Sequence, residues 1–233
     1  QCGKTSSVVA FARKHYKHVI YIDFHEQEHL CSLFDGSLSV DYLIMAISAS
    51  VPNAQFVPKK TCLILDEIQN CPRARSSLKF FMQDGRYDVI CTGSLLSVSG
   101  YKSAEQIKVE SQATIPVGAE TIVDMYPMDF EEWLWANGIA SNIFDYLKKS
   151  LLDETPIAAS IHERLRQLLL EYIVVGGMPE AVKTFFATHD MNQVAQVQRH
   201  ILNGYRDDMI KYARAEDKPR IRECFDSIPR QLS

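Results

Sequence analysis

The sequence predicts an α/β fold in which a doubly wound parallel sheet is followed by a helical part. Short apolar runs alternate with helical segments over the first half of the chain, and such alternation requires a parallel sheet. After residue 128 the strand pattern stops, and apolar residues recur at steps of three and four, as they do along helices. We therefore expect two domains, a sheet domain over residues 1–128 and a helical domain over residues 129–233.

Four segments of the first half have the apolar pattern of strands, and three others have the pattern of helices. The expected strands are residues 18–24, 61–67, 88–94 and 120–125. The expected helices are residues 4–12, 40–47 and 73–82.

The second half is expected to be a helical bundle that begins after Pro127. A short helix over residues 130–134 comes first, followed by a longer one over residues 161–172. Gly176 and Gly177 would end that helix, and Pro179 would open the next one, since glycine favours helix ends and proline favours helix starts. An apolar stripe then runs from residue 194 to residue 212. We interpret these stripes as bundle core and not as a cofactor site.

The chain opens with Gly3-Lys4-Thr5, the closing tripeptide of the phosphate-binding pattern G-x-x-x-x-G-K-[ST]. Its glycine lets N–H groups approach phosphate oxygens, and the N-terminus of the helix that follows adds a positive dipole. Lys4 would neutralise the β- and γ-phosphates of a nucleotide, and the Thr5 hydroxyl would bind Mg²⁺. The tripeptide also occurs in ordinary turns. The candidate nucleotide-binding residues are Gln1, Cys2, Gly3, Lys4, Thr5 and Ser6.

Two carboxylates, Asp66 and Glu67, follow the apolar run that starts at Thr61. A buried parallel strand would deliver both to the C-terminal edge of the sheet, where doubly wound folds bind ligands. Asp66 would hold Mg²⁺, usually through water, and Glu67 would polarise the water that attacks the γ-phosphate. A strand followed by a polar turn would account for the pair if it stood alone. With Gly3-Lys4-Thr5 upstream, a nucleotide site is favoured.

The third expected strand ends in small hydroxyl residues and not in charge. If it lies beside the Asp66 strand, Ser94 or Thr92 could hydrogen-bond the attacking water or the γ-phosphate. Ser94 is the preferred candidate because it lies one step beyond the strand. A strand that leaves through a Gly-Ser turn remains the alternative.

Five motifs together resemble the prokaryotic AAA-superfamily ATPases, and more narrowly the group with a C-terminal domain of unknown function after the ATPase. They are Q-C-G-K-T at residues 1–5, L-I-L-D-E-I-Q at 63–69, I-C-T-G-S-L-L at 90–96, Y-P-M-D-F-E-E-W at 126–133 and G-G-M-P-E at 176–180. The resemblance spans nearly the whole chain. It implies a P-loop NTPase sheet, ATP and Mg²⁺ as ligands, and hydrolysis of ATP to ADP and phosphate.

The resemblance also implies what surrounds this chain. The helical half would be a lid over the nucleotide, and residues 226–233 resemble the start of a C-terminal part that contains a winged helix and often a nuclease-like domain. The strand that leads into the phosphate loop would precede Gln1 and lie between the third and fourth expected strands. We therefore expect the natural protein to extend beyond both ends. Hydrolysis would drive or switch a conformational change in the C-terminal domain.

Composition narrows the choice of partners and compartment. The net charge is −4, from 25 basic and 29 acidic residues, so no overall basic field attracts nucleic acid. The six cysteines form no C-x-x-C pair, which favours reduced buried thiols in a cytoplasmic protein. Glu171 interrupts the longest apolar stretch, and no membrane partner is expected. A homo-oligomer, and a DNA or protein partner of the C-terminal part, are left open.

Other functional classes fit the sequence less well than an ATPase. A GTPase would need the guanine-reading pattern N-K-x-D, which is absent, and no acceptor pocket of a small-molecule kinase is recognisable. A non-hydrolysing nucleotide switch or a DNA-associated interaction module is the alternative. An arginine finger could come from Arg73, Arg75 or Arg206, and the sequence does not assign this role to any one of them.

The polar segment 100–118 is expected to be a surface loop.

Overall fold

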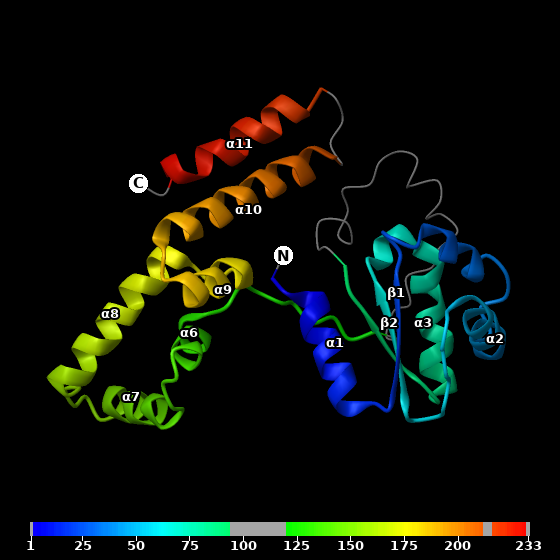
Figure 1. Cartoon of the computed structure of the whole chain (residues 1–233), viewed down its shortest axis with the longest axis horizontal. Coiled ribbons are helices and arrows are strands. Elements are labelled where there is room, and N and C mark those ends of the chain that lie inside the picture. Colours follow the sequence, from blue (N-terminus) through cyan, green and yellow to red (C-terminus); the bar gives the residue numbers. More distant parts are fainter. Residues whose placement is uncertain (1, 94–119, 212–215, 232–233) are drawn as a thin grey trace. The chain divides into compact units, whose positions relative to one another are not determined.

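The computed structural model describes residues 2–93, 120–211 and 216–231. These residues form two compact units (Figure 1). One unit consists of residues 3–123 and 208–233, and the other of residues 124–207 with the first two residues. The first contains the sheet, and the second contains most of the helices that follow it.

The sheet of the first unit has, among the described residues, three parallel strands in the order β1-β2-β3. They are β1 (His18–Asp23), β2 (Thr61–Asp66) and β3 (Asp88–Cys91). Asp23 pairs with Asp66, and Leu65 pairs with Cys91, so the three strands end together at one edge. This confirms the α/β fold class and the first three expected strands, and it places the Asp66 strand beside the strand that precedes Thr92.

Helices cover both faces of this sheet. Helix α1 (Lys4–His15) packs on one face, where Ala12 contacts Cys62 and Ile64 in a buried cluster. The other face carries the larger core, which is built from the strands and from the 3₁₀ helix η1 (Glu28–Phe34), α2 (Val40–Ser50) and α3 (Pro72–Asp84). Every residue of β2 is buried, which explains why its sequence is an unbroken apolar run and not an alternating one.

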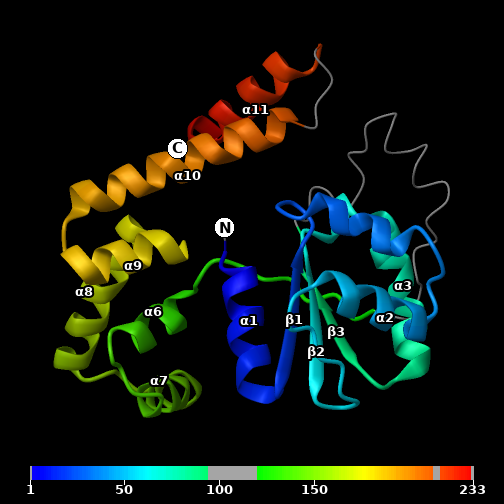
Figure 2. The ribbon, with the colours of Figure 1, turned by 45° about the vertical axis from the view of Figure 1, so that its right-hand side comes forward.

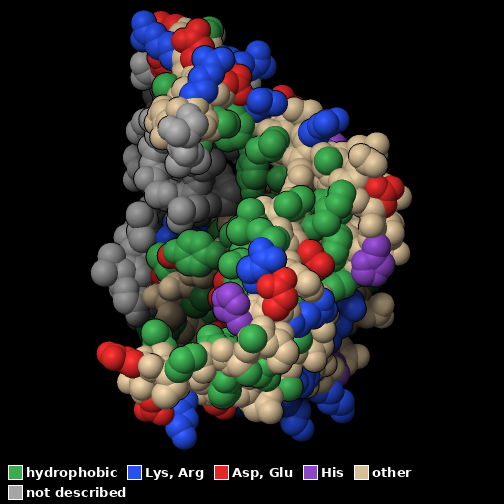
Figure 3. All heavy atoms as spheres, turned by 90° about the vertical axis from the view of Figure 1, so that its left-hand side faces the viewer, with side chains coloured by type: hydrophobic (Ala, Val, Ile, Leu, Met, Phe, Trp, Pro, Cys, Tyr) green, Lys and Arg blue, Asp and Glu red, His purple; other side chains and the backbone are tan. Residues whose placement is uncertain are grey.

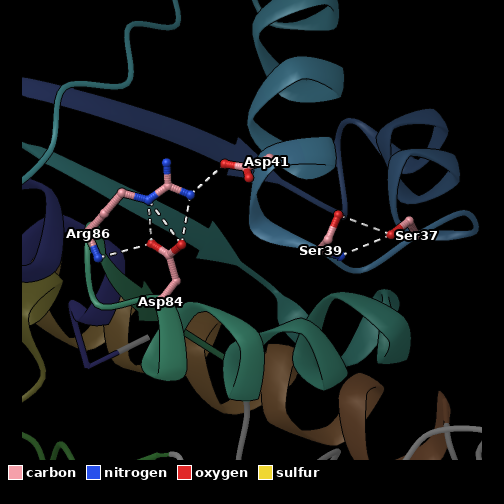
Figure 4. A network of polar contacts seen from close by, with 5 residues as sticks. All are labelled: Ser37, Ser39, Asp41, Asp84 and Arg86. Carbon is pink, nitrogen blue, oxygen red and sulfur yellow. Dashed lines mark hydrogen bonds and ion pairs between the residues drawn. The ribbon is translucent and has the colours of Figure 1, made fainter.

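Arg86 links the two helices of the larger core (Figure 4). Its guanidinium donates to Asp84 at the C-terminal end of α3, at 2.7 Å, and to Asp41 in the first turn of α2, at 2.5 Å. Ser37 and Ser39 hydrogen-bond to each other just before α2 begins. Because the Asp41 carboxylate is exposed, we expect this network to fix the geometry of the helix ends more than to stabilise the fold.

The expected fourth strand is wrong. Residues 120–125 belong to no strand in the described part of the chain. Ile122 and Val123 are 69% and 82% exposed, so the β-branched composition that suggested a strand has no partner strand to pack or pair with. Glu120 instead accepts a bidentate ion pair from Arg75 of α3, which ties this segment to the helix.

The second unit is helical. Its elements are α6 (Phe130–Ala136), α7 (Asn142–Leu152), α8 (Ala159–Val175), α9 (Pro179–Thr188) and the greater part of α10 (Met191–Lys211). The core consists of Trp133, Leu134, Leu168, Val175, Ala181, Val182, Phe185 and Val194. Leu168 and Val194 of the expected stripes belong to this core, and Ile201 is buried too, whereas Leu169 is exposed and residue 212 lies outside the described residues. Helices α7, η1 and α11 (Lys218–Gln231) were not predicted.

Two of the sequence motifs meet in this unit. The N–H of Met128 donates to the carbonyl of Gly177 at 2.8 Å, and the hydroxyl of Tyr172 donates to the carbonyl of Met128 at 2.8 Å. A side chain at position 177 would place its Cβ 2.0 Å from the Met128 carbonyl oxygen, so only glycine fits there. Asp129 and Glu132 then form a capping box that starts α6.

One face of α8 is apolar and exposed. Leu169, Leu170, Ile173 and Val174 are between 39% and 66% exposed. Figure 3 shows exposed hydrophobic side chains gathered on one face of the molecule. Exposed apolar rows are common on surfaces that contact a partner. Among the described residues, no helix is both long and apolar enough to cross a membrane.

All six cysteines are free. Cys62 is fully buried in β2, and its burial raises the pKa of the thiol to about 11. Burial likewise raises the thiol pKa of Cys71, Cys91 and Cys31. These thiols are therefore protonated at neutral pH, as expected of structural cysteines that do not react.

Candidate functional site

The candidate residues gather where strands β1, β2 and β3 end. Helix α1 begins at this same end of the sheet, as Figures 1 and 2 show. The chain enters α1 through Gly3, whose φ of 82° lies in the left-handed region that favours glycine. Its carbonyl accepts the N–H of Ser7 at 3.0 Å. The first N–H groups of a helix lack acceptors within it, so the start of α1 offers donors to an anion.

Asp66 lies at the centre of the site. Its side chain ends β2 and is 3% exposed. The hydroxyl of Thr5, from the first turn of α1, donates to Oδ2 of Asp66 at 2.9 Å. This bond joins the Gly-Lys-Thr tripeptide to the acidic strand end across 61 residues of sequence.

Three further donors converge on the same carboxylate. The hydroxyl of Tyr21, on β1, donates to Oδ2 at 2.7 Å. The hydroxyl of Thr92, just after β3, donates to Oδ1, as does the N–H of Glu67 at 3.0 Å. Contact with these donors explains how a carboxylate can be buried at this position, because a buried charge is tolerated only where it is hydrogen-bonded.

The Tyr21 ring is partly exposed while its hydroxyl faces the buried carboxylate. Burial of this end of the side chain, and then the bond to Asp66, raise the pKa of Tyr21 above its ordinary value. The phenol therefore keeps its proton and donates a hydrogen bond throughout the neutral pH range.

Glu67 adopts a conformation that is unusual for its type. Its φ is 52° and its ψ is 46°, the left-handed region, which is strained for a residue with a Cβ. Its carboxylate accepts a hydrogen bond from the amide nitrogen of Gln69, within the turn that follows β2. A strained residue next to the buried Asp66 points to a functional constraint at position 67.

Gln69 connects Glu67 with the turn after β3. The carbonyl oxygen of its side chain is buried and has no hydrogen-bond partner among the described residues. A Cβ at Gly93 would lie 2.7 Å from that oxygen, so a side chain at position 93 would require the Gln69 amide to shift.

The structure brings some of the expected site residues together. Thr5, Asp66 and Thr92 contact one another through Asp66, and Glu67 follows directly. Lys4 is half-buried at the start of α1, while Ser6 is exposed. Cys2 is described outside any helix or strand. Gln1, Ser94 and the segment 100–118 lie outside the described residues.

Tyr21 and Gln69 were not identified from the sequence. Tyr21 lies in register with Ile64, two residues before Asp66, so both side chains lie on one face of the sheet. A known strand register would have revealed this contact. Gln69 lacks such a signal, because its contact with Glu67 depends on the left-handed turn.

The residues present fit a magnesium ion. Asp66 and Thr5 offer a carboxylate and a hydroxyl oxygen, and Mg²⁺ prefers oxygen ligands. Within the described ranges no group of three or more His, Cys, Asp or Glu side chains could hold a metal by itself. A cation here would take its other ligands from phosphate and water, as Mg²⁺ usually does.

All three arginines considered as fingers have hydrogen-bond partners within this chain. Arg73 donates to the carbonyls of Phe34 and Gly36, at 2.7 and 3.1 Å, and Arg75 pairs with Glu120. The third, Arg206, donates to Asn203 at 3.1 Å. We assign no finger to any of them.

A parallel sheet in which Gly-Lys-Thr opens α1 and bonds to an acidic residue at the end of β2 defines the class of P-loop NTPase folds. The family model described as an AAA domain matches residues 1–134, and the chain belongs to this family. A second model, described as a domain of unknown function, matches residues 166–233. The chain thus combines an AAA domain with a C-terminal part that matches a domain of unknown function, as the sequence motifs predicted.

Among solved structures, the chain is similar to the Walker-type ATPase PABY2304 of Pyrococcus abyssi. The identity is 13% and the TM-score is 0.40, over 98% of this chain and 69% of that one. No curated protein matches the chain.

The left-handed conformation of Glu67 yields a stability prediction. Replacing Glu67 with glycine should give a more stable protein than replacing it with alanine, by about 1 kcal/mol, because only glycine adopts this φ without strain. Both variants lack the carboxylate, so each is the control for the other. Urea unfolding measures the difference, and an alanine variant as stable as the glycine variant would contradict strain at this position.

Proposed function

We propose that this protein binds ATP with Mg²⁺ and hydrolyses it to ADP and phosphate. The observation that carries this proposal is the hydrogen bond from Thr5 to Asp66, which unites the phosphate-binding tripeptide and the acidic strand end in one site. Membership of the AAA domain family supports nucleotide binding. The reaction and the roles of single residues are our inference.

Lys4 and the start of α1 would bind the phosphates. The Lys4 ammonium group carries a full charge that offsets the β- and γ-phosphates, and the N–H groups of the first turn add hydrogen bonds. Gly3, in its left-handed conformation, keeps the backbone close enough for these contacts. The other proposed contacts to the nucleotide, from Gln1, Cys2 and Ser6, rest on the motif alone.

Thr5 and Asp66 would hold Mg²⁺, which would neutralise charge on the β- and γ-phosphates. Glu67 would accept a proton from the attacking water, and Gln69 would orient the Glu67 carboxylate through the bond they share. Thr92 is directed at Asp66 in this structure, so we propose that it orients the carboxylate. A contact of Thr92 or Ser94 with the γ-phosphate or the water remains a prediction.

A non-hydrolysing nucleotide switch is the second candidate. One observation favours it: the bond from Gln69 holds the Glu67 carboxylate within its own turn, and Glu67 can act as the base only if this position also faces the attacking water. Turnover by the full-length protein separates the two candidates, since both bind nucleotide and only one releases phosphate.

Substituting Lys4 with alanine should weaken ATP binding roughly 10- to 100-fold, because it removes a charged donor to the phosphates. Lys14→Ala, an exposed lysine in the last turn of the same helix, is the matched control and should bind as the wild type does. Calorimetry on the full-length protein measures both affinities. If Lys4→Ala bound ATP unchanged, the phosphate site would be misassigned.

Binding and chemistry should separate at the two carboxylates. Glu67→Gln should retain ATP yet hydrolyse it about 10²- to 10⁴-fold more slowly, because an amide cannot accept the proton. Asp66→Asn should instead weaken the dependence of binding on Mg²⁺. Phosphate release and nucleotide affinity are measured for each variant. Equal losses of turnover with unchanged binding in both would contradict this division of roles.

We further propose that residues 129–233 form a lid that responds to the nucleotide and acts on a C-terminal domain, in a cytoplasmic protein. The apolar packing of the helical core supports the lid, and the six free cysteines support the cytoplasmic location.

ATP should raise protection from hydrogen exchange across residues 160–211. Protection confined to α1 and the end of β2 would leave the helices without a role in switching.

A further inference from the structure

Tyr21 is the most exposed of the described side chains that donate to Asp66. It is 37% exposed, whereas Thr5 is half-buried, Thr92 is buried and the Glu67 donor is a backbone N–H. Its hydroxyl lies 2.7 Å from Oδ2 of Asp66, the oxygen that also accepts the hydroxyl of Thr5. The proposed function assigns Tyr21 no role.

The donors fill the accepting capacity of the carboxylate. An ionised carboxyl group has about four lone-pair sites, two on each oxygen. In this structure Oδ2 accepts from Thr5 and Tyr21, and Oδ1 accepts from Thr92 and Glu67. A cation, or a water bound to it, can therefore reach Asp66 only if one of these donors gives way.

Three of the donors can remain in place when a cation binds: Thr92 and Glu67 are held by the backbone, and Thr5 need not leave. Thr92 is fixed on both sides, because its N–H donates to Leu65 and its carbonyl accepts the N–H of Ile68, each at 3.0 Å. The N–H of Glu67 belongs to the backbone of a constrained turn. Thr5 has no need to leave, because a hydroxyl can donate its proton to Asp66 while its own lone pairs bind a cation.

We propose that Tyr21 is a positioning residue that occupies the metal-facing side of Asp66 and is displaced when Mg²⁺ binds. The proposal rests on the proposed nucleotide site, and it adds a regulatory element to that site. The phenol holds the buried carboxylate in place while no cation is present. It thereby lowers the apparent affinity for Mg²⁺, since the bond to Tyr21 must be broken first.

The structure provides a matched control for this residue. Tyr16 also donates its hydroxyl to a carboxylate, that of Asp88, at 2.9 Å. Tyr16 follows α1 and Asp88 begins β3, at the edge of the sheet opposite the end of β2. Tyr16→Phe removes the same group from the same type of bond, away from Asp66.

The test is a titration of the full-length protein with Mg²⁺ in the presence of ADP, a probe that undergoes no hydrolysis. Binding is followed by calorimetry in the wild type, Tyr21→Phe and Tyr16→Phe. Tyr21→Phe should reach half-saturation at roughly 2- to 10-fold lower Mg²⁺, the equivalent of one net hydrogen bond. Tyr16→Phe should match the wild type. Tyr21→Leu, which also lacks the hydroxyl, should shift in the same direction as Tyr21→Phe.

Two outcomes would overturn the proposal while the nucleotide site stands. One is an equal Mg²⁺ midpoint in Tyr21→Phe and Tyr16→Phe, with ADP bound normally by both. The other is a higher midpoint in Tyr21→Phe, which would mean that the phenol assists the metal and does not compete with it. Failure of the wild type to bind ADP at any Mg²⁺ concentration would remove the proposed function, and this inference with it.

Discussion

The hydrogen bonding of one buried carboxylate is the constraint on which the site depends. Asp66 is 3% exposed, and a charge in that position is tolerated only when donors surround it. Those donors come from separate parts of the chain: the first turn of α1, strand β1, and the turns after β2 and β3. Correct pairing of all three strands with α1 is therefore a condition for burying Asp66, so the fold and the site form together.

A strained backbone conformation and a close contact between the backbone and a side chain occur at the same edge of the sheet as Asp66. Glu67 is held in the left-handed region, and the backbone at Gly93 lies against Gln69. Such features weaken a fold slightly and persist where the surrounding structure enforces them. Here the surrounding structure is the well-packed sheet, whose central strand is buried along its full length. The cores on its two faces provide the rigidity that a site built from short side chains requires.

Much of this could be predicted from sequence, for physical reasons that differ by element. The buried strand β2 and the helical stripes have strong local signals, since an unbroken short apolar run is typical of a buried strand and a three-to-four periodicity is typical of a helix. The segment 120–125 had the composition of a strand but lacks a partner, and composition alone cannot supply one. Tyr21 and Gln69 could not be found because their contacts depend on strand register and on a left-handed turn, neither of which is visible in sequence.

Asp66 is, on this view, the metal-facing carboxylate of a nucleotide site, and the proposed chemistry depends on that role. The most direct measurement is electron paramagnetic resonance of Mn²⁺, a spectroscopic substitute for Mg²⁺, bound to the full-length protein with ATP. We predict that the wild type binds Mn²⁺ tightly only when nucleotide is present, and that Asp66→Asn loses most of this nucleotide-dependent binding. Equal binding of Mn²⁺ by the wild type and Asp66→Asn, or binding that is indifferent to nucleotide, would contradict this role of Asp66.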